Sequence, residues 1–132
     1  MSLQICIMTP EKVFFNEKAD EIILPTNTGQ MGVLANHAPL ISALDIGIML
    51  IRTQNTWNSI ALMGGFVLVQ KNQVTVLVNE AESAKTLNKE QVELAFNEAK
   101  NQFEKAEGTK QKVEANFAFK RARARYQLVK EN

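Results

Sequence analysis

The feature that most constrains this chain is a change of sequence pattern near residue 82. From residue 3 to about residue 79, short runs of Ile, Val and Leu show β-like alternation and are separated by Gly, Pro and Asn. After the change, no Gly or Pro occurs until Gly108, and the good helix formers Ala, Glu, Lys and Gln dominate. The pattern therefore predicts a β domain over residues 1–84 and a helical domain over residues 85–132.

The first part contains many short predicted strands with dense turn signals between them, which favours an antiparallel β-sandwich or flattened barrel. Two hairpins are the best defined, Ile46–Arg52 with Trp57–Met63, and Phe66–Gln70 with Val74–Val78. We expect a turn at Gly64-Gly65 between them. The predicted strands are Leu3–Met8, Lys12–Phe15, Glu21–Leu24, Val33–Leu34, Ile41–Leu44, Ile46–Arg52, Asn58–Met63, Phe66–Gln70 and Val74–Val78.

The second part reads as two antiparallel helices joined by a short connection. Asn88 followed by Gln91 resembles a capping box at the start of the first helix. Gly108 is expected to end that helix as a C-terminal cap, and a second helix can run from about Lys110 to Lys130. The fold class is therefore α+β, an N-terminal antiparallel β-sandwich followed by a C-terminal two-helix hairpin.

The second predicted helix carries two apolar stripes, which no single neighbour can cover. The first helix and the sandwich can each cover one stripe. Alternatively, a partner outside the chain covers one of them, or the hairpin moves. The stripes are Ala115, Ala118, Phe119, Ala122, Tyr126 and Val129 on one side, and Val113, Phe117, Ala124 and Leu128 on the other.

The charges of the two parts differ, although the whole chain is nearly neutral at a formal +1. A balance this close to zero argues against a strong overall attraction to nucleic acid or to anionic lipid. The helical part is basic, and cations near a helix C-terminus interact favourably with its dipole. The cluster Lys120, Arg121, Arg123 and Arg125 exceeds what such capping needs.

The residues that catalysis or cofactor binding would need are missing. The lone His37 has no nearby carboxylate in the sequence to orient it, and with one histidine a two-histidine zinc site is impossible. The glycine-rich segments lack the Gly-Lys-Ser/Thr end of a phosphate-binding loop. We expect no enzyme, no cofactor and no metal.

The sequence shows no membrane-spanning or targeting segment. No apolar run approaches the roughly 18 residues that a membrane span needs. The first residues contain neither a basic segment nor a long apolar one, so we expect no presequence. The single Cys6 excludes an intramolecular disulfide and fits a reducing compartment.

Several segments, in this order, resemble the ε subunits of F-type ATP synthases. The last three of these segments resemble the plastid and cyanobacterial branch in particular, and the resemblance covers essentially the whole chain. The matching segments are Thr28–Leu40 (TGQMGVLANHAPL), Leu44–Gly47 (LDIG), Ala61–Phe66 (ALMGGF), Val74–Val78, Lys105–Gly108 (KAEG), Val113–Asn116 (VEAN) and Arg121–Arg123 (RAR).

This resemblance implies a non-catalytic subunit of the rotating central stalk, which couples rotation of the c-ring to ATP synthesis. The sandwich would bind the γ subunit and sit on the c-ring, with Gln30, Met31 and His37 in the loop that faces the ring. The subunit would be peripheral to a thylakoid membrane, on its stromal or cytoplasmic side, and associated with the membrane only through the complex.

The resemblance also implies a regulatory role for the helical hairpin. In related proteins the basic second helix meets an acidic segment of a catalytic β subunit and restrains ATP hydrolysis, so the α and β subunits are transient partners. The matching cations here are Lys120, Arg121, Arg123 and Arg125.

One motif departs from the family pattern. Some bacterial ε subunits bind ATP through Ile/Leu-Asp-x-x-Arg-Ala at the start of the first helix, and here that place reads Leu87–Val92 (LNKEQV). Without the arginine there is no guanidinium fork for a phosphate, so we predict no useful ATP binding by this chain.

Two other classes of protein are weighed against this interpretation. An unrelated β-sandwich that recognises carbohydrate or peptide, with a dimerising helical hairpin, would need clustered exposed aromatics. The chain has only 9 aromatic residues (7 Phe, 1 Tyr and 1 Trp), which makes such a platform hard to build. An enzyme is disfavoured because no convergent set of polar groups is visible.

Overall fold

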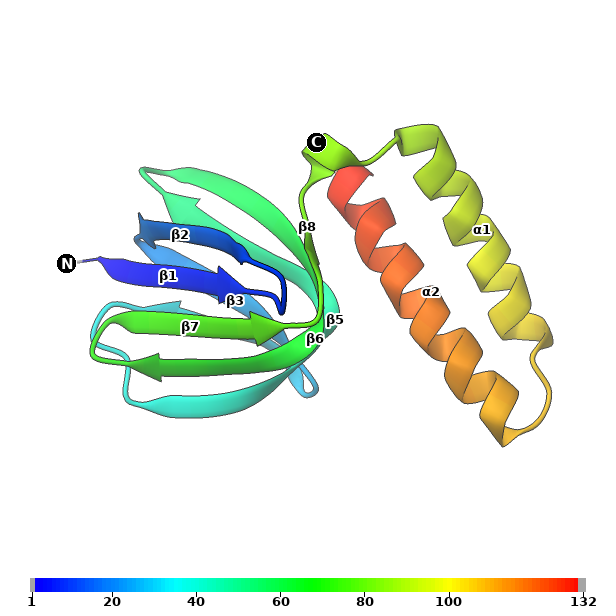
Figure 1. The fold of residues 1–132 in the computed structure, drawn as a ribbon, viewed down its shortest axis with the longest axis horizontal. Helices are drawn as coiled ribbons and strands as arrows, with labels where there is room; N and C mark the ends of the chain where they lie inside the picture. The colour runs from blue at the N-terminus through cyan, green and yellow to red at the C-terminus, as the bar shows by residue number, and fades with distance from the viewer. Residues whose placement is uncertain (1, 131–132) are drawn as a thin grey trace.

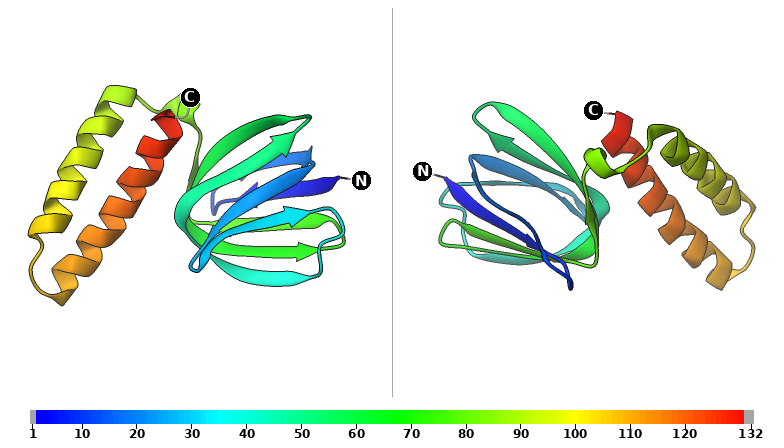
Figure 2. Two further views of the ribbon diagram at one scale, coloured as in Figure 1. Left: turned by 180° about the vertical axis from the view of Figure 1, so that it is seen from behind. Right: turned by 45° about the horizontal axis from the view of Figure 1, so that its top comes forward.

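The computed structural model describes residues 2–130 as a β-sandwich beside a helical hairpin (Figure 1). Helix α1 spans Lys89–Lys105 and helix α2 spans Thr109–Lys130. Helix α2 lies between α1 and the sandwich, and the loop joining the two helices points away from the sandwich in every view (Figure 2). This arrangement confirms the predicted fold class.

The strands form one continuous sheet that folds over into two layers (Figure 1). Their order is β2-β1-β7-β6-β5-β3-β4, and β8 pairs with β6. Within residues 2–130 the neighbouring strands are antiparallel, apart from the parallel pair β1 and β7. Strand bounds are Leu3–Met8 (β1), Val13–Ala19 (β2), Glu21–Thr26 (β3), Gly29–Leu34 (β4), Leu40–Thr53 (β5), Thr56–Gln70 (β6), Gln73–Val78 (β7) and Ala81–Glu82 (β8).

The core between the two layers follows from the period of two along each strand. In β1, for example, Leu3, Ile5 and Ile7 are fully buried and alternate with half-buried residues. Equivalent positions of the other strands complete one cluster of Ile, Leu, Val, Met and Ala side chains. Both predicted hairpins have the expected pairing, with Arg52 opposite Trp57 and Phe66 opposite Leu77.

The prediction that β5 and β6 are each two separate strands is wrong. Each is a single long strand that crosses from one layer to the other and changes side-chain parity at a bend. Ladder pairing jumps from Leu44–Gly65 to Ile46–Met63, so Asp45 and Gly64 lie unpaired between them. The turn predicted at Gly64-Gly65 is instead this bend within β6. A glycine pair is typical of turns and of bulges alike, so the sequence does not distinguish the two.

Gly65 is required at this bend for two reasons. Its φ of 156° lies outside the range that L-residues commonly adopt, and a Cβ atom there would lie 2.0 Å from the carbonyl oxygen of Leu77. Strand β7 can therefore approach the bend closely only because this position has no side chain.

Two strands at the sheet edges are longer than predicted. Strand β2 continues to Ala19 rather than ending at Phe15, and β4 begins at Gly29 rather than at Val33. Thr26 pairs with Gly29 across the β3–β4 hairpin, so the turn between these strands is only two residues long. Gly29 and Gly32 both lie within β4.

The capping prediction for α1 is confirmed at its N-terminus, where the Asn88 side chain accepts a hydrogen bond of 3.0 Å from the Gln91 amide. Gly108 does not cap α1, however, because the C-cap is Ala106 in an extended conformation. Gly108 has a φ of 80°, and its carbonyl accepts the first hydrogen bond of α2, from the Lys112 amide. The glycine therefore starts the second helix rather than ending the first.

A row of stacked aromatic rings joins the two helices. Phe96 of α1 stacks on Tyr126 and Phe119 of α2, with ring centroids 4.6 and 5.8 Å apart. Phe103 also stacks on Phe119, with ring centroids 5.4 Å apart. These contacts cover the first apolar stripe of α2.

The sandwich covers only part of the second stripe. Ala124 and Leu128 are buried in a small cluster against Ala61 and Met63 of β6, with Ile46 and Ile48 of β5 beside them. Val113 and Phe117, nearer the start of α2, are half exposed. The prediction that the first helix and the sandwich each cover one stripe of α2 therefore holds for the C-terminal half of the helix.

Candidate functional site

The cationic cluster on α2 splits into two paired and two exposed side chains. Arg125 and Lys120 form ion pairs with carboxylates of the sandwich. Arg121 and Arg123 are exposed, and within the described residues neither makes an ion pair. Sequence reasoning treated the four as equivalent, but the fold distinguishes them.

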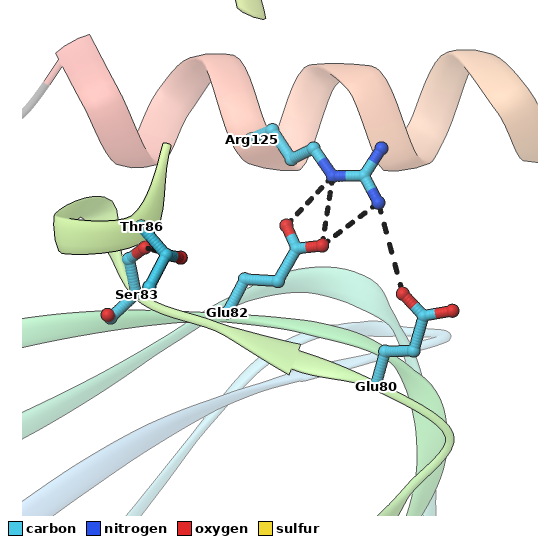
Figure 3. Close-up of polar contacts among 5 residues, drawn as sticks. All are labelled: Glu80, Glu82, Ser83, Thr86 and Arg125. Atoms are coloured by element: carbon cyan, nitrogen blue, oxygen red, sulfur yellow. Dashed lines mark hydrogen bonds and ion pairs between the residues drawn. The ribbon is translucent and has the colours of Figure 1, made fainter. Parts of the chain in front are cut away.

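Arg125 makes the strongest polar contact between the helix and the sandwich (Figure 3). Its Nε donates to Oε2 of Glu82 at 2.8 Å, and its Nη2 donates to Oε1 at 2.9 Å. Nη2 also lies 3.9 Å from a carboxylate oxygen of Glu80. A forked contact of this kind fixes direction as well as distance.

The charge state of Arg125 follows from this contact. Its hydrogen bond with Glu82 raises the pKa of the guanidinium above its ordinary value, partly opposed by burial, and the negative charges of Glu82 and Glu80 add to the rise. The side chain therefore remains a cation throughout the pH range in which the protein is folded.

Lys120 contacts the sandwich at the bend of β5. Its Nζ lies 3.3 Å from both carboxylate oxygens of Asp45. Oδ1 of Asp45 also accepts a 2.8 Å hydrogen bond from the Ile46 amide, so the carboxylate is held in place by its own strand. The unpaired bulge residue of β5 thus supplies the partner for Lys120.

The exposed pair lies on the rest of the helix surface. The Arg123 guanidinium lies over the Phe119 ring at 5.3 Å from its centroid, which orders the side chain without neutralising it. Arg121 is exposed, and its position around the helix axis lies between the buried residues Ala124 and Leu128 and the paired Arg125. Both charges are available to an acidic partner.

The residues predicted for the c-ring loop do not form one cluster. Gln30 is exposed and pairs with Pro25 near the β3–β4 turn, whereas Met31 is partly buried against the core. His37 follows the far end of β4, where Asn36 hydrogen-bonds with Asn72 of the β6–β7 turn. The Nδ1 of His37 donates to the Ala38 carbonyl at 2.7 Å. Gln30 lies four residues before the end of β4, about 13 Å along the strand, and His37 lies in the turn beyond that end.

An apolar surface on the outer face of the sandwich was not predicted. Phe66 lies directly opposite Leu77 of β7, which lies opposite Met8 of β1, and Ile41 and Leu68 form the next row. Ile41 is 75% exposed and Phe66 is 59% exposed. We call Met8, Ile41, Phe66, Leu68 and Leu77 the outer apolar patch.

The signal for this patch was present in the sequence. Strands β5 and β6 contain the continuous non-polar runs Ile46–Ile51 and Ile60–Val69, whereas a strand with one solvated face alternates with polar residues. Strands with such runs expose apolar side chains on both faces of the sheet. Helix α2 covers the apolar side chains of one half of the outer face, and the outer apolar patch is the half that α2 does not cover.

A small cavity lies between the start of α1 and the end of α2, with a volume of about 320 Å³. Its lining includes Leu87, Asn88 and Gln91 from the segment compared above with the ATP motif. Arg125 is the one cation among its lining residues, and its guanidinium is already paired with Glu82. The arrangement is consistent with the predicted lack of ATP binding, which stays a prediction.

Neither a metal site nor a membrane span is found within residues 2–130. No group of three or more His, Cys, Asp or Glu side chains there is placed to hold a metal ion. Neither α1 nor α2 is both long and apolar enough to cross a bilayer.

Two family models match consecutive parts of the chain. Residues 2–84 match the beta-sandwich domain of the ATP synthase delta/epsilon chain. Residues 85–130 match the long alpha-helix domain of the same chain. Because both halves match one family, an unrelated binding module with a helical hairpin no longer fits.

Individual relatives agree with the family models. The chain is 74% identical to the chloroplastic ATP synthase epsilon chain of Tupiella akineta over 129 residues, which cover 98% of this chain and 99% of the relative. It is 67% identical to that of Chlorella vulgaris over 131 residues, with 99% and 98% coverage. The resemblance to the plastid branch is thereby confirmed.

Solved structures show the same fold. A chain of the Euglena gracilis mitochondrial ATP synthase superposes with a TM-score of 0.81 at 21% identity, covering 93% of this chain and 78% of that one. The matches of both halves and the closely similar relatives lead to one conclusion. The chain belongs to the ATP synthase delta/epsilon chain family, as a subunit that is not itself catalytic.

Proposed function

We propose that the two parts of the chain divide the work of a central-stalk subunit. Residues 1–84 dock on the γ subunit and on the c-ring, and thereby couple rotation to ATP synthesis. Residues 85–132 regulate the complex by restraining ATP hydrolysis. The subunit acts at a thylakoid membrane, on the stromal or cytoplasmic side, and is held there through the complex.

The outer apolar patch is the observation that carries the docking role. Soluble monomers rarely expose a large contiguous apolar surface, and such patches mark interfaces with other proteins. Here Met8, Phe66 and Leu77 form one cross-strand row over three adjacent strands. We assign this face to the γ subunit, because a flat sheet face suits a large protein surface better than a small ligand.

Contact with the c-ring is assigned to the β4 region. Gln30 is exposed beside the β3–β4 turn, and His37 is half-buried beyond the other end of the strand. Met31 is partly buried and contributes by positioning the strand. The two ends of β4 would then meet different parts of the stalk base.

The restraint on ATP hydrolysis is assigned to the cations of α2. Arg121 and Arg123 present two exposed guanidinium groups, and residues two positions apart point to different sides of a helix. Each group can pair with a carboxylate of an acidic segment, here one of a catalytic β subunit. Lys120 and Arg125 would join this contact when they are not paired with the sandwich.

The docking role is tested by Phe66→Asp in a capture assay with purified γ subunit. Placing a charge in the centre of the patch should weaken capture by at least about tenfold. Leu94→Asp is the matched control, because Leu94 is 70% exposed but lies on α1. Equal capture of γ by both variants would exclude the patch as the docking surface.

The restraint is tested by changing Arg121 and Arg123 together to Ala in the assembled enzyme. ATP hydrolysis should increase relative to the parent complex. The control changes Lys110 and Lys112 to Ala, which removes the same charge from exposed positions of the same helix. The role of these arginines is refuted if hydrolysis stays equally restrained in both variants.

A further inference from the structure

Asn72 joins three segments of the sandwich at the end that lies away from the helical hairpin (Figure 1). It is the second residue of the two-residue turn between β6 and β7. Its carbonyl oxygen accepts a hydrogen bond of 2.8 Å from the Gln4 amide of β1. Its side-chain Oδ1 accepts from the Asn36 amide at 2.6 Å, and its Nδ2 donates to Oδ1 of Asn36 at 3.3 Å. Asn72 therefore ties the connection between β4 and β5 to the sheet.

The β4–β5 connection, residues 35–39, lies outside the ladders of the sheet. Its β-turn hydrogen bond, from the His37 amide to the Leu34 carbonyl, is long at 3.3 Å, and Pro39 has no amide to donate. Asn36 occupies the third position of that turn with a φ of 68°, a conformation that Gly and Asn adopt more readily than other residues. The contact with Asn72 holds Asn36 in this conformation and thereby places the adjacent His37.

We propose that Asn72 is a positioning residue for the contact between His37 and the c-ring. The inference rests on the proposed docking of the sandwich. Nδ1 of His37 donates to the Ala38 carbonyl at 2.7 Å, so Nε2 is the acceptor of the neutral imidazole, and it makes no hydrogen bond within residues 2–130. A hydrogen-bond donor of the ring is the group that Nε2 fits. A connection already held in place loses less conformational freedom when the ring binds.

A comparison with the β5–β6 turn shows that hairpin geometry does not require these contacts. Both turns contain two residues with positive φ, Gln54-Asn55 and Lys71-Asn72, as two-residue hairpins prefer. Asn55 and Asn72 hold equivalent second positions, with φ values of 67° and 62°. The Asn55 side chain, however, makes no hydrogen bond within the part of the chain that the structure describes. The side-chain contacts of Asn72 therefore serve the β4–β5 connection rather than its own turn.

The first test is amide hydrogen exchange of the full chain, compared between Asn72→Gly and Asn72→Asp. Glycine keeps the positive φ but removes both side-chain contacts, so the Asn36 amide should exchange at least about tenfold faster. Aspartate keeps an acceptor for that amide, and the Asn36 side chain can turn over to donate to it, so exchange should stay near the parental rate. Asn55→Gly is the matched control and should leave the Asn36 amide unchanged. Parental exchange of this amide in Asn72→Gly would overturn the positioning role.

The second test measures coupling in the assembled enzyme, with each variant added in excess to vesicle-bound complex depleted of this subunit. Excess subunit compensates for weaker assembly, so the readout is the number of protons pumped per ATP hydrolysed. Asn72→Gly should lower this ratio to about the same extent as His37→Ala, whereas Asn72→Asp and Asn55→Gly should keep the parental value. A parental ratio in Asn72→Gly, in a complex whose ratio His37→Ala lowers, would contradict the inference.

The same measurements separate this inference from the proposed function on which it rests. If His37→Ala keeps the parental ratio, the proposed contact of His37 with the ring is refuted. The exchange rate of the Asn36 amide then shows independently whether Asn72 holds the β4–β5 connection.

Discussion

The sandwich and the hairpin are stabilised by different kinds of contact. The sandwich encloses a continuous apolar core that every long strand contributes to. The two helices of the hairpin contain only five buried apolar residues within the described chain, Val92, Ala122, Ala124, Leu128 and Val129. Its other contacts are stacked rings and ion pairs.

This difference bears on the local stability of the two parts. Detaching the hairpin would expose a smaller apolar cluster and release charges that water solvates well, whereas opening the sandwich would expose its whole core. A sandwich with a continuous core and a hairpin with a smaller contact surface thus coexist in one short chain. Four substitutions test this contrast.

The largest effect is expected in the sandwich, from Gly65→Ala. The added Cβ would collide with the Leu77 carbonyl, so unfolding should become easier by about 3 kcal/mol or more. Denaturation in urea, followed by circular dichroism, measures the change. Gly32→Ala is the control, because no atom lies within 4 Å of a Cβ built there. Equal stability of the two variants would mean that the bend is not constrained as described.

A smaller and local effect is expected from Leu128→Ala in the hairpin. Removing this fully buried side chain should weaken docking of α2 on the sandwich by about 2–3 kcal/mol. Hydrogen exchange should accelerate in α2 and stay unchanged in the sandwich. Phe117→Ala, at a half-exposed position of the same helix, should do neither. Faster exchange throughout the chain would contradict the independence of the two parts.

The start of α1 should show an effect of about 1 kcal/mol on substitution of its cap. Asn88→Ala removes the acceptor for the Gln91 amide, so the first turn of the helix should fray. Exchange of the α1 amides measures this loss. Asn97→Ala, in the exposed middle of the helix, should be neutral or slightly stabilising. If both variants behave alike, the cap does not anchor the helix.

The smallest effect is expected from an ion pair within the sandwich. Arg52 lies 3.1 Å from Glu21, with both side chains about one-quarter exposed. Arg52→Met should therefore lower the stability of the sandwich by less than about 1 kcal/mol. Arg125→Met is the comparison, and it should leave global unfolding unchanged but speed exchange in α2. A large loss of global stability in Arg52→Met would show that charges matter as much in the sandwich as in the hairpin.

Much of the fold could be predicted because it depends on local pattern. The change from β to helix, the hairpin ending at Val78 and the cap at Asn88 follow from periodicity and turn chemistry. The bends of β5 and β6 could not, since Gly64-Gly65 fits a turn and a bulge equally well. The tertiary pairing of Ile46 with Met63 decides between them.

The candidate site divides in the same way. Four clustered cations were visible in the sequence, but their partners Asp45 and Glu82 lie 75 and 43 residues away from Lys120 and Arg125. The outer apolar patch likewise needs the strand order, because only the sheet brings Met8 beside Leu77.

The sequence by itself determined the two kinds of secondary structure, the boundary between them and the excess of positive charge on the last helix. These properties depend on residues that are close in the chain. The spacing of apolar residues, three or four in a helix and two in a strand, describes them. Only the tertiary structure decided which apolar faces are covered and which cations are paired. Those outcomes depend on the packing of distant segments, and it is the packing that leaves Arg121 and Arg123 exposed while Lys120 and Arg125 hold the hairpin to the sandwich.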